Sequence, residues 1–297
     1  MRPRRSPALA ALLLAAFAAE AQEFKQVGQL TILVDASRAY PGGLFGVEFV
    51  SRRPLGTLLV SLDGRKYPAL LSHGGVRALV PVPVDTPPGP RSLGVEVYGR
   101  RGRQRITLAT AIAERSYPAR TTVISLEKRP LLDQPQVLRQ SRRLMLALRT
   151  LTIPAQWSGA FTAPVSTAGS GFGSRQTWIG GSAVEQLSDG LFGEYHRGID
   201  YPVVPGTLVQ APAAGTVLFA GTLTLLGQTL VLDHGQGVTS LLCHLGRVEA
   251  RDRDRVEARA VVGVSGSTGI AASPHVHWGL YVHGVAVDPE LAMKGLE

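Results

Sequence analysis

The chain has 297 residues, a length that favours two domains, and its 44% hydrophobic and 18% charged residues exclude a mainly disordered protein. Its 34 glycines and 20 prolines suit a turn-rich β protein, and its single cysteine excludes both an intramolecular disulfide and a cysteine-rich zinc site. The net charge of +9 is not arranged as a basic helix with interleaved aromatic residues, so no nucleic-acid partner is expected.

The first 21 residues have the three-part layout of a secretory signal peptide. A start with three arginines precedes an apolar run over residues 8–19, and Ala19 and Ala21 supply the small residues of a cleavage site. The run is shorter than the roughly 20 residues that span a bilayer, and no later stretch is apolar enough to cross one. We therefore expect export to the periplasm, cell envelope or medium, with no transmembrane segment in the mature chain.

Residues 22–120 contain short apolar runs separated by turn residues. Asp63-Gly64 lies between two such runs and is a strong signal for a two-residue hairpin. Leu93, Val95 and Val97 show the period of two that is typical of a strand with one buried face. Regular short strands of this kind predict an immunoglobulin-like β-sandwich over residues 22–120.

Residues 121–154 are expected to link this sandwich to a second domain. Within them, apolar residues between Val137 and Leu148 recur at a spacing of three to four. This periodicity predicts a connecting helix, which we interpret as docking between the two domains.

Residues 155–297 differ in composition and are expected to form a second, antiparallel β domain, which makes the protein all-β. Six of the seven histidines follow residue 190: His196, His234, His244, His275, His277 and His283. Two of them have structural interpretations, because His234 is expected to stabilise a turn and His283 precedes Gly284 in a hairpin turn. The other four call for a chemical explanation.

His196 and Asp200 are four residues apart, and Gly198 lies between them. Four residues of a straight strand span about 13 Å, too far for two side chains to share an ion. Gly198 and two prolines close behind disfavour a helix. A chain bent at Gly198 would bring the imidazole and the carboxylate together.

His275 and His277 stand two residues apart in a β context, so both should point to the same face with Cα atoms about 7 Å apart. One of them can bind a metal while the other stands beside a metal-bound water. His244 lies on an apolar strand, where Cys243 alternates with it and is expected to point into the core.

A catalytic zinc site needs three protein ligands and one open position for water. His196, Asp200 and one of His275 and His277 could supply the three ligands, which leaves two histidines for proton transfer and charge stabilisation. Bound zinc lowers the pKa of its water towards about 7 and polarises a carbonyl, and both effects serve amide hydrolysis.

The motifs of residues 157–289 resemble, in order and spacing, those of the lysostaphin-type (LytM-like, M23) zinc metallopeptidases, which cut bacterial peptidoglycan. They are GAF (159–161), FGSR (172–175), HRGID (196–200), APAAGTV (211–217), DHGQG (233–237), CHL (243–245), VSGSTG (264–269) and PHVHWG (274–279). The resemblance implies an M23-type metallopeptidase domain over residues 155–297.

The resemblance implies one Zn²⁺ per chain, with His196, Asp200 and His277 as its ligands, and His244 and His275 as the catalytic pair. One departure is Leu242, where family members often carry a tyrosine that helps to hold the oxyanion. Tyr195 and Tyr201 are nearby candidates for that role.

The leading hypothesis is a secreted zinc endopeptidase that hydrolyses peptide cross-links of peptidoglycan. The main alternative is a non-catalytic LytM-like protein that binds the wall or activates other hydrolases. A cysteine peptidase that uses Cys243 lacks its usual sequence context, and a zinc D-Ala-D-Ala carboxypeptidase should have a glutamate where Ser273-Pro274 stand. The cleaved bond, a glycine bridge or a D-amino-acid cross-link, and the role of the first domain stay open.

Overall fold

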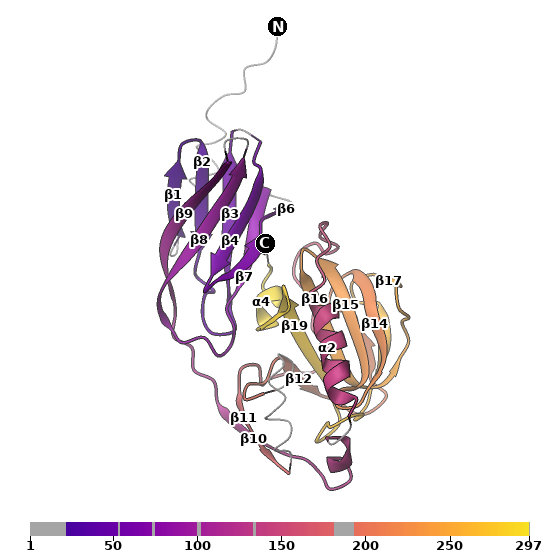
Figure 1. The fold of residues 1–297 in the computed structure, drawn as a ribbon. Coiled ribbons are helices and arrows are strands. Elements are labelled where there is room, and N and C mark those ends of the chain that lie inside the picture. Colours follow the sequence, from indigo (N-terminus) through magenta and orange to yellow (C-terminus); the bar gives the residue numbers. More distant parts are fainter. Residues whose placement is uncertain are drawn as a thin grey trace.

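The computed structural model describes residues 22–52, 54–72, 75–99, 102–132, 135–180 and 193–296. The predicted signal peptide over residues 1–21 lies outside these residues. The chain forms two β-rich parts, with the expected helix packed against the second (Figure 1). This confirms the all-β prediction.

The first part is a sandwich of two antiparallel sheets. One sheet contains, in spatial order, β1 (Gln22–Val27), β2 (Leu30–Asp35), β3 (Leu44–Ser51), β7 (Gly75–Pro81) and β6 (Leu70–Ser72). The other contains β5 (Arg65–Pro68), β4 (Thr57–Leu62), β8 (Gly89–Gly99) and β9 (Gly102–Ile112). Apart from the additional β1, this strand order is that of an immunoglobulin-like sandwich, as predicted.

The predicted hairpin at Asp63-Gly64 is present. Leu62 and Arg65 are paired, and the two residues between them have φ angles of 47° and 80°. Positive φ at both central positions is the requirement of the two-residue turn that matches strand twist, and aspartate and glycine tolerate it well.

The connection between the two parts begins after β9, earlier than the expected boundary at residue 120. It contains β10 (Ala119–Val123), the short 3-10 helix η1 (Arg129–Leu131) and α2 (Val137–Leu148). The helix is present where the periodicity predicted it. Contrary to the expectation, it does not dock between the two domains. Its buried side chains Leu144, Met145 and Leu148 pack on apolar residues of strands β14, β15 and β16 in the second part (Figure 1). The apolar face of the helix therefore completes the second domain.

The second part is built on a nine-stranded sheet. Its main order is β12 (Ile199–Pro202), β19 (His275–Val282), β16 (Val238–Val248), β15 (Gly227–Gly235), β14 (Gly215–Leu223) and β17 (Arg255–Val256). At its margins, β13 (Leu208–Gln210) pairs with β18 (Val261–Ser265), and β20 (Val285–Val287) pairs with β19. A short helix, α4 (Glu290–Met293), follows β20.

A hydrophobic core joins the two parts. Leu44 and Leu79 of the sandwich belong to the same buried cluster as Leu291 and Leu296 near the C-terminus. Figure 1 shows α4 between the sandwich and the sheet. A polar contact reinforces this junction, because Arg115 lies 3.1 Å from the buried carboxylate of Asp288. Removing the sandwich would therefore expose apolar surface of the second domain.

Among the residues that the structure describes, no helix combines the length and the apolar character needed to cross a membrane.

His234 has a structural role at the end of β15. Its Nδ1–H donates to the Ala214 carbonyl at 2.8 Å, and its Nε2 accepts from the Ser240 hydroxyl at 2.8 Å. Trp278 Nε1 in turn donates to the Ser240 oxygen at 3.0 Å. Burial lowers the pKa of His234 from 6.5 to about 4, so the ring is neutral in the folded protein.

His283 and Gly284 form the two-residue turn between β19 and β20, as predicted, with φ angles of 51° and 77°. The His283 ring is partly buried and lies 5.6 Å, between ring centroids, from Tyr67 of the sandwich. Burial lowers the pKa of His283 from 6.5 to about 4. As the pH falls, His283 therefore binds a proton in the unfolded chain at a higher pH than it does in the folded protein.

We predict that His283→Asn reduces the acid sensitivity of the fold, because asparagine tolerates the positive φ and does not titrate. The stability that neutral His283 provides is complete above pH 6.5 and is lost as the pH falls towards about 4. The wild type should lose about 3 kcal/mol more unfolding free energy than the variant between pH 8 and pH 4. Urea unfolding at both pH values measures this difference, and equal losses would contradict it.

Candidate metal centre

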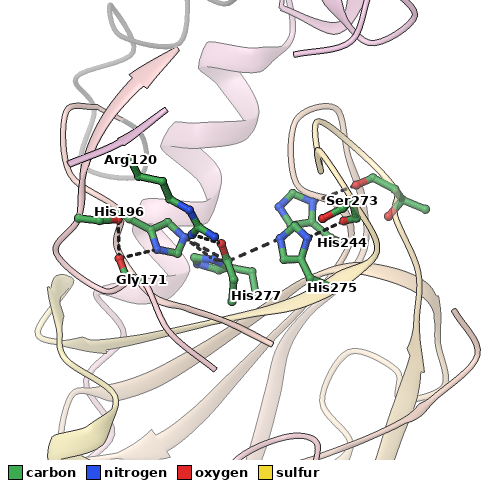
Figure 2. Close-up of polar contacts among 10 residues, drawn as sticks. Arg120, Gly171, His196, His244, Ser273, His275 and His277 are labelled. Carbon is green, nitrogen blue, oxygen red and sulfur yellow. Dashed lines mark hydrogen bonds and ion pairs between the residues drawn. The ribbon is translucent and has the colours of Figure 1, made fainter. Parts of the chain in front are cut away.

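Three potential metal ligands converge where β12 pairs with β19. Asp200 and His277 are direct cross-strand partners, and Asp200 Oδ1 lies 2.9 Å from His277 Nδ1. His196, three residues before β12, places its Nε2 3.1 Å from the same Oδ1 and 3.1 Å from His277 Nδ1 (Figure 2). Within the described residues, these three side chains form a group whose ligand atoms all lie within 4.8 Å of one another.

Gly198 allows this convergence in two ways. The chain bends at Gly198, which turns His196 back towards Asp200 as the sequence predicted. A Cβ at this position would also lie 2.5 Å from His277 Nε2 and 2.5 Å from the Trp278 carbonyl oxygen. A larger residue at position 198 would therefore displace the His277 ring from its place beside Asp200.

A hydrogen bond to the backbone orients His196. Its Nδ1 lies 3.0 Å from the Gly171 carbonyl oxygen, which can only accept, so Nδ1 carries the proton. The lone pair of a neutral His196 is then on Nε2, the atom that faces Asp200 and His277. Holding the second ring nitrogen in this way is common for histidines that bind metals.

His244 and His275 stand together beside the three converging residues (Figure 2). Their ring centroids are 4.8 Å apart, and His275 Nε2 lies 3.6 Å from Asp200 Oδ1. His244 Nδ1 donates to the Thr268 carbonyl at 2.9 Å, and His275 Nδ1 donates to the Ser273 carbonyl at 2.7 Å. Each neutral ring therefore keeps an unprotonated Nε2.

The backbone at His244 departs from a regular strand. Its φ is 60°, and the pairing register between β15 and β16 shifts at this point, between Leu242 and Leu245. The alternation expected for Cys243 and His244 is thus interrupted by a bulge, which re-aims the histidine. Left-handed backbone at a non-glycine residue is uncommon, and such strain is found most often at functional sites.

Cys243 is fully buried, as predicted, but it is the direct cross-strand partner of His277. Burial, and then the charge of Asp200, raise the pKa of the thiol well above its ordinary value. A thiolate nucleophile needs a lowered pKa and access to solvent. The cysteine peptidase alternative is therefore disfavoured.

The electrostatics suit metal binding. Burial alone would raise the pKa of Asp200, but its contacts with His196 and His277 hold it well below the ordinary value. Burial and the neighbouring His275 and His277 lower the pKa of His244 to about 3, and burial also lowers the pKa of His277. At neutral pH the Asp200 carboxylate is charged and the His277 imidazole is neutral, which are the protonation states that metal ligands require. The neighbouring His244 imidazole is neutral as well.

A cavity of about 430 Å³ opens over these side chains. Tyr195 lines it, whereas Tyr201 is buried in the core and does not line it. Of the two candidate tyrosines, Tyr195 is thus the one at the site. The cavity wall also contains Arg120 and the linker residues 121–123, for which the sequence carried no recognised signal.

The three donors fit a metal of the zinc type. Two imidazole nitrogens and one carboxylate oxygen form a ligand set found in catalytic zinc sites, which leave one coordination position open. The cavity in front of these donors provides access for a water and a substrate.

Residues 194–289 match the model of Peptidase family M23. The DD-carboxypeptidase/endopeptidase Mpg of Neisseria meningitidis serogroup B is 35% identical over 94 residues, which are 32% of this chain and 22% of that protein. The glycyl-glycine endopeptidase ALE-1 of Staphylococcus capitis is 34% identical over 91 residues, which are 30% of this chain and 25% of that protein. The matched region thus spans a quarter or less of these two relatives.

A solved structure resembles the whole arrangement. The crystal structure of a peptidase M23 from Pseudomonas aeruginosa covers 87% of this chain and 96% of its own, with a TM-score of 0.63 and 25% sequence identity. The similarity therefore extends beyond the region that matches the family model.

Proposed function

Residues 194–289 form an M23 peptidase domain, and from this we propose that the protein is a secreted zinc metalloendopeptidase that hydrolyses peptide cross-links of bacterial peptidoglycan. The observation that carries the proposal is the meeting of His196, Asp200 and His277 beside the paired rings of His244 and His275. A structural metal site would have no need of two further histidines that line the same cavity and are each held through Nδ1 by a backbone carbonyl.

His196 Nε2, Asp200 Oδ1 and His277 Nδ1 would hold the metal. Zinc bound there would acidify a water molecule and polarise the scissile carbonyl. The chain supplies the remaining chemistry through its two free imidazoles. Positioned general acid–base groups of this kind contribute about 10²–10⁴-fold to a reaction rate.

His275 and His244 have complementary positions for moving a proton. His275 Nε2 lies 3.6 Å from Asp200 Oδ1, which places this ring nitrogen next to the expected metal position. His244 is more deeply buried and stays neutral at pH 7 because of its low pKa. We assign His275 to proton transfer and His244 to orientation of the oxyanion or its proton.

The substrate class rests on the two relatives, which are named as peptidases of different peptide bonds. One name states a DD-carboxypeptidase/endopeptidase and the other a glycyl-glycine endopeptidase. The proposal therefore covers peptide cross-links and leaves the bond to experiment. Export is the part of the proposal that rests on the predicted signal peptide, and a mature N-terminus at Gln22 in protein from the cell envelope would support it.

Mass spectrometry of muropeptides tests the proposal directly. The zinc-loaded protein would be incubated with purified sacculi that contain either glycine bridges or direct D-amino-acid cross-links. We expect cross-linked dimers to disappear in one of the two preparations, with new amino termini that identify the bond. A chelator should stop the reaction and added zinc should restore it. Binding to sacculi without any loss of cross-links would instead support the non-catalytic, wall-binding alternative.

A further inference from the structure

The linker that leaves the sandwich passes directly over the metal centre. Arg120 lies on its strand β10, and Arg120 Nη1 is 3.1 Å from Asp200 Oδ2. Figure 2 shows Arg120 reaching the site beside His196, while His244 and His275 lie on the other side. The arginine therefore approaches the metal ligands from the part of the cavity opposite the two proposed catalytic histidines.

The two oxygens of Asp200 have separate partners. Oδ1 faces His277 at 2.9 Å, His196 at 3.1 Å and His275 at 3.6 Å. Oδ2 faces the guanidinium of Arg120. A charge-assisted hydrogen bond to one oxygen fixes the rotation of the carboxylate, and here it leaves the other oxygen directed at the imidazoles.

The position of Arg120 is built into the fold. Strand β10 runs parallel to β11 (Arg175–Ile179), with Arg120 opposite Gln176. Gly171 leaves space for the guanidinium, because a Cβ there would lie 2.9 Å from Arg120 Nη1 and 3.1 Å from His196 Nδ1. The absence of a side chain at residue 171 thus lets both Arg120 and His196 approach.

The linker is also fastened further along the chain. Lys128 Nζ donates to the Ser267 carbonyl at 2.9 Å and to the Ala271 carbonyl at 2.5 Å. Between these two residues lies Thr268, whose carbonyl accepts from His244 Nδ1. The segment that carries Arg120 is therefore held at both ends against the walls of the same site.

We propose that Arg120 is a positioning residue of the metal centre: it holds Asp200 through Oδ2 so that Oδ1 is presented to the metal. This inference rests on the proposed metallopeptidase function and deepens it, because it makes the interdomain linker part of the site. Loss of partners that orient metal ligands commonly lowers metal affinity by about 10–100-fold.

The test measures metal affinity in the full chain without any substrate. Zn²⁺ and Co²⁺ would be titrated in competition with a chromophoric chelator into the wild type, Arg120→Ala and Arg120→Lys. We expect the dissociation constant of Arg120→Ala to rise about 10–100-fold and the Co²⁺ absorption bands to shift, with partial recovery in Arg120→Lys. Arg247→Ala is the matched control, because it also removes an arginine paired with a carboxylate, that of Glu249, but this exposed arginine of β16 does not line the cavity.

Unchanged or tighter metal binding by Arg120→Ala would overturn the proposal. Tighter binding is the result expected if the guanidinium competes with the metal ion for Asp200, because the substitution would then remove a competitor. A raised KM at unchanged metal affinity would also overturn it and assign Arg120 to substrate binding. Circular dichroism of the metal-free variants checks folding, and Arg120→Lys provides a second test if the alanine variant is unfolded. Metal binding that depends on Arg120 in a protein without hydrolytic activity would refute only the proposed function.

Discussion

Asp200→Asn is expected to abolish stoichiometric zinc binding and, with it, hydrolysis of peptidoglycan. The carboxylate is the centre of the site: its Oδ1 lies within 3.1 Å of both His196 and His277, and it carries the only negative charge among the three donors. Asparagine keeps the shape but removes that charge. Loss of a residue that only orients a metal ligand lowers metal affinity or activity by about 10–100-fold. Loss of the ligand itself should therefore lower activity by more than about 100-fold.

Elemental analysis of the purified variant and the release of muropeptides measure the two effects. Asp85→Asn is a suitable control, because this exposed aspartate of the sandwich lies outside the cavity wall. A full zinc content in Asp200→Asn would refute the assignment of Asp200 as a ligand. Loss of zinc without loss of hydrolysis would refute a metal-dependent mechanism.

The second large effect is expected at the paired histidines. His244→Asn and His275→Ala should retain zinc and lose about 10²–10⁴-fold in kcat, the usual contribution of positioned acid–base groups. Asparagine is chosen at position 244 because it tolerates the left-handed backbone, whose φ is 60°. The expected signature is therefore a protein with full metal content, an unchanged fold and little turnover.

Cys243→Ala is the matched control for His244→Asn, since it changes the adjacent residue of the same strand. Cys243 is buried and its thiol pKa is raised, so hydrolysis should be unchanged. Loss of activity in Cys243→Ala at full stability would restore the thiol hypothesis. Wild-type turnover in both histidine variants would contradict the proposed mechanism.

Much of the fold followed from local patterns. The hairpins at Asp63-Gly64 and His283-Gly284 were predictable because two-residue turns demand positive φ, and few residue types accept it. The amphipathic helix was predictable from its period. The surface on which it docks was not, because a helical stripe of apolar residues indicates that a face is buried but not which sheet covers it.

The candidate site was predictable where its geometry is local. Gly198 implied that His196 and Asp200 could meet, and the structure brings them together. The direction of His244 was not predictable, because strict alternation along a strand fails at a bulge that only the pairing with β15 reveals. The place of Arg120 beside Asp200 was not predictable either, because it depends on the parallel pairing of β10 with β11, for which the sequence contains no recognised pattern.

The sequence by itself determined the chemical inventory of this protein: imidazoles and a carboxylate in motifs with metal-ligand spacing, and one cysteine in an apolar strand. The tertiary structure decided which of these groups meet. His277 lies opposite Asp200, whereas His275 lies opposite Pro202, because the register between β12 and β19 is set by long-range pairing. Such contacts join residues far apart in the chain, and short-range periodicity carries no information about them.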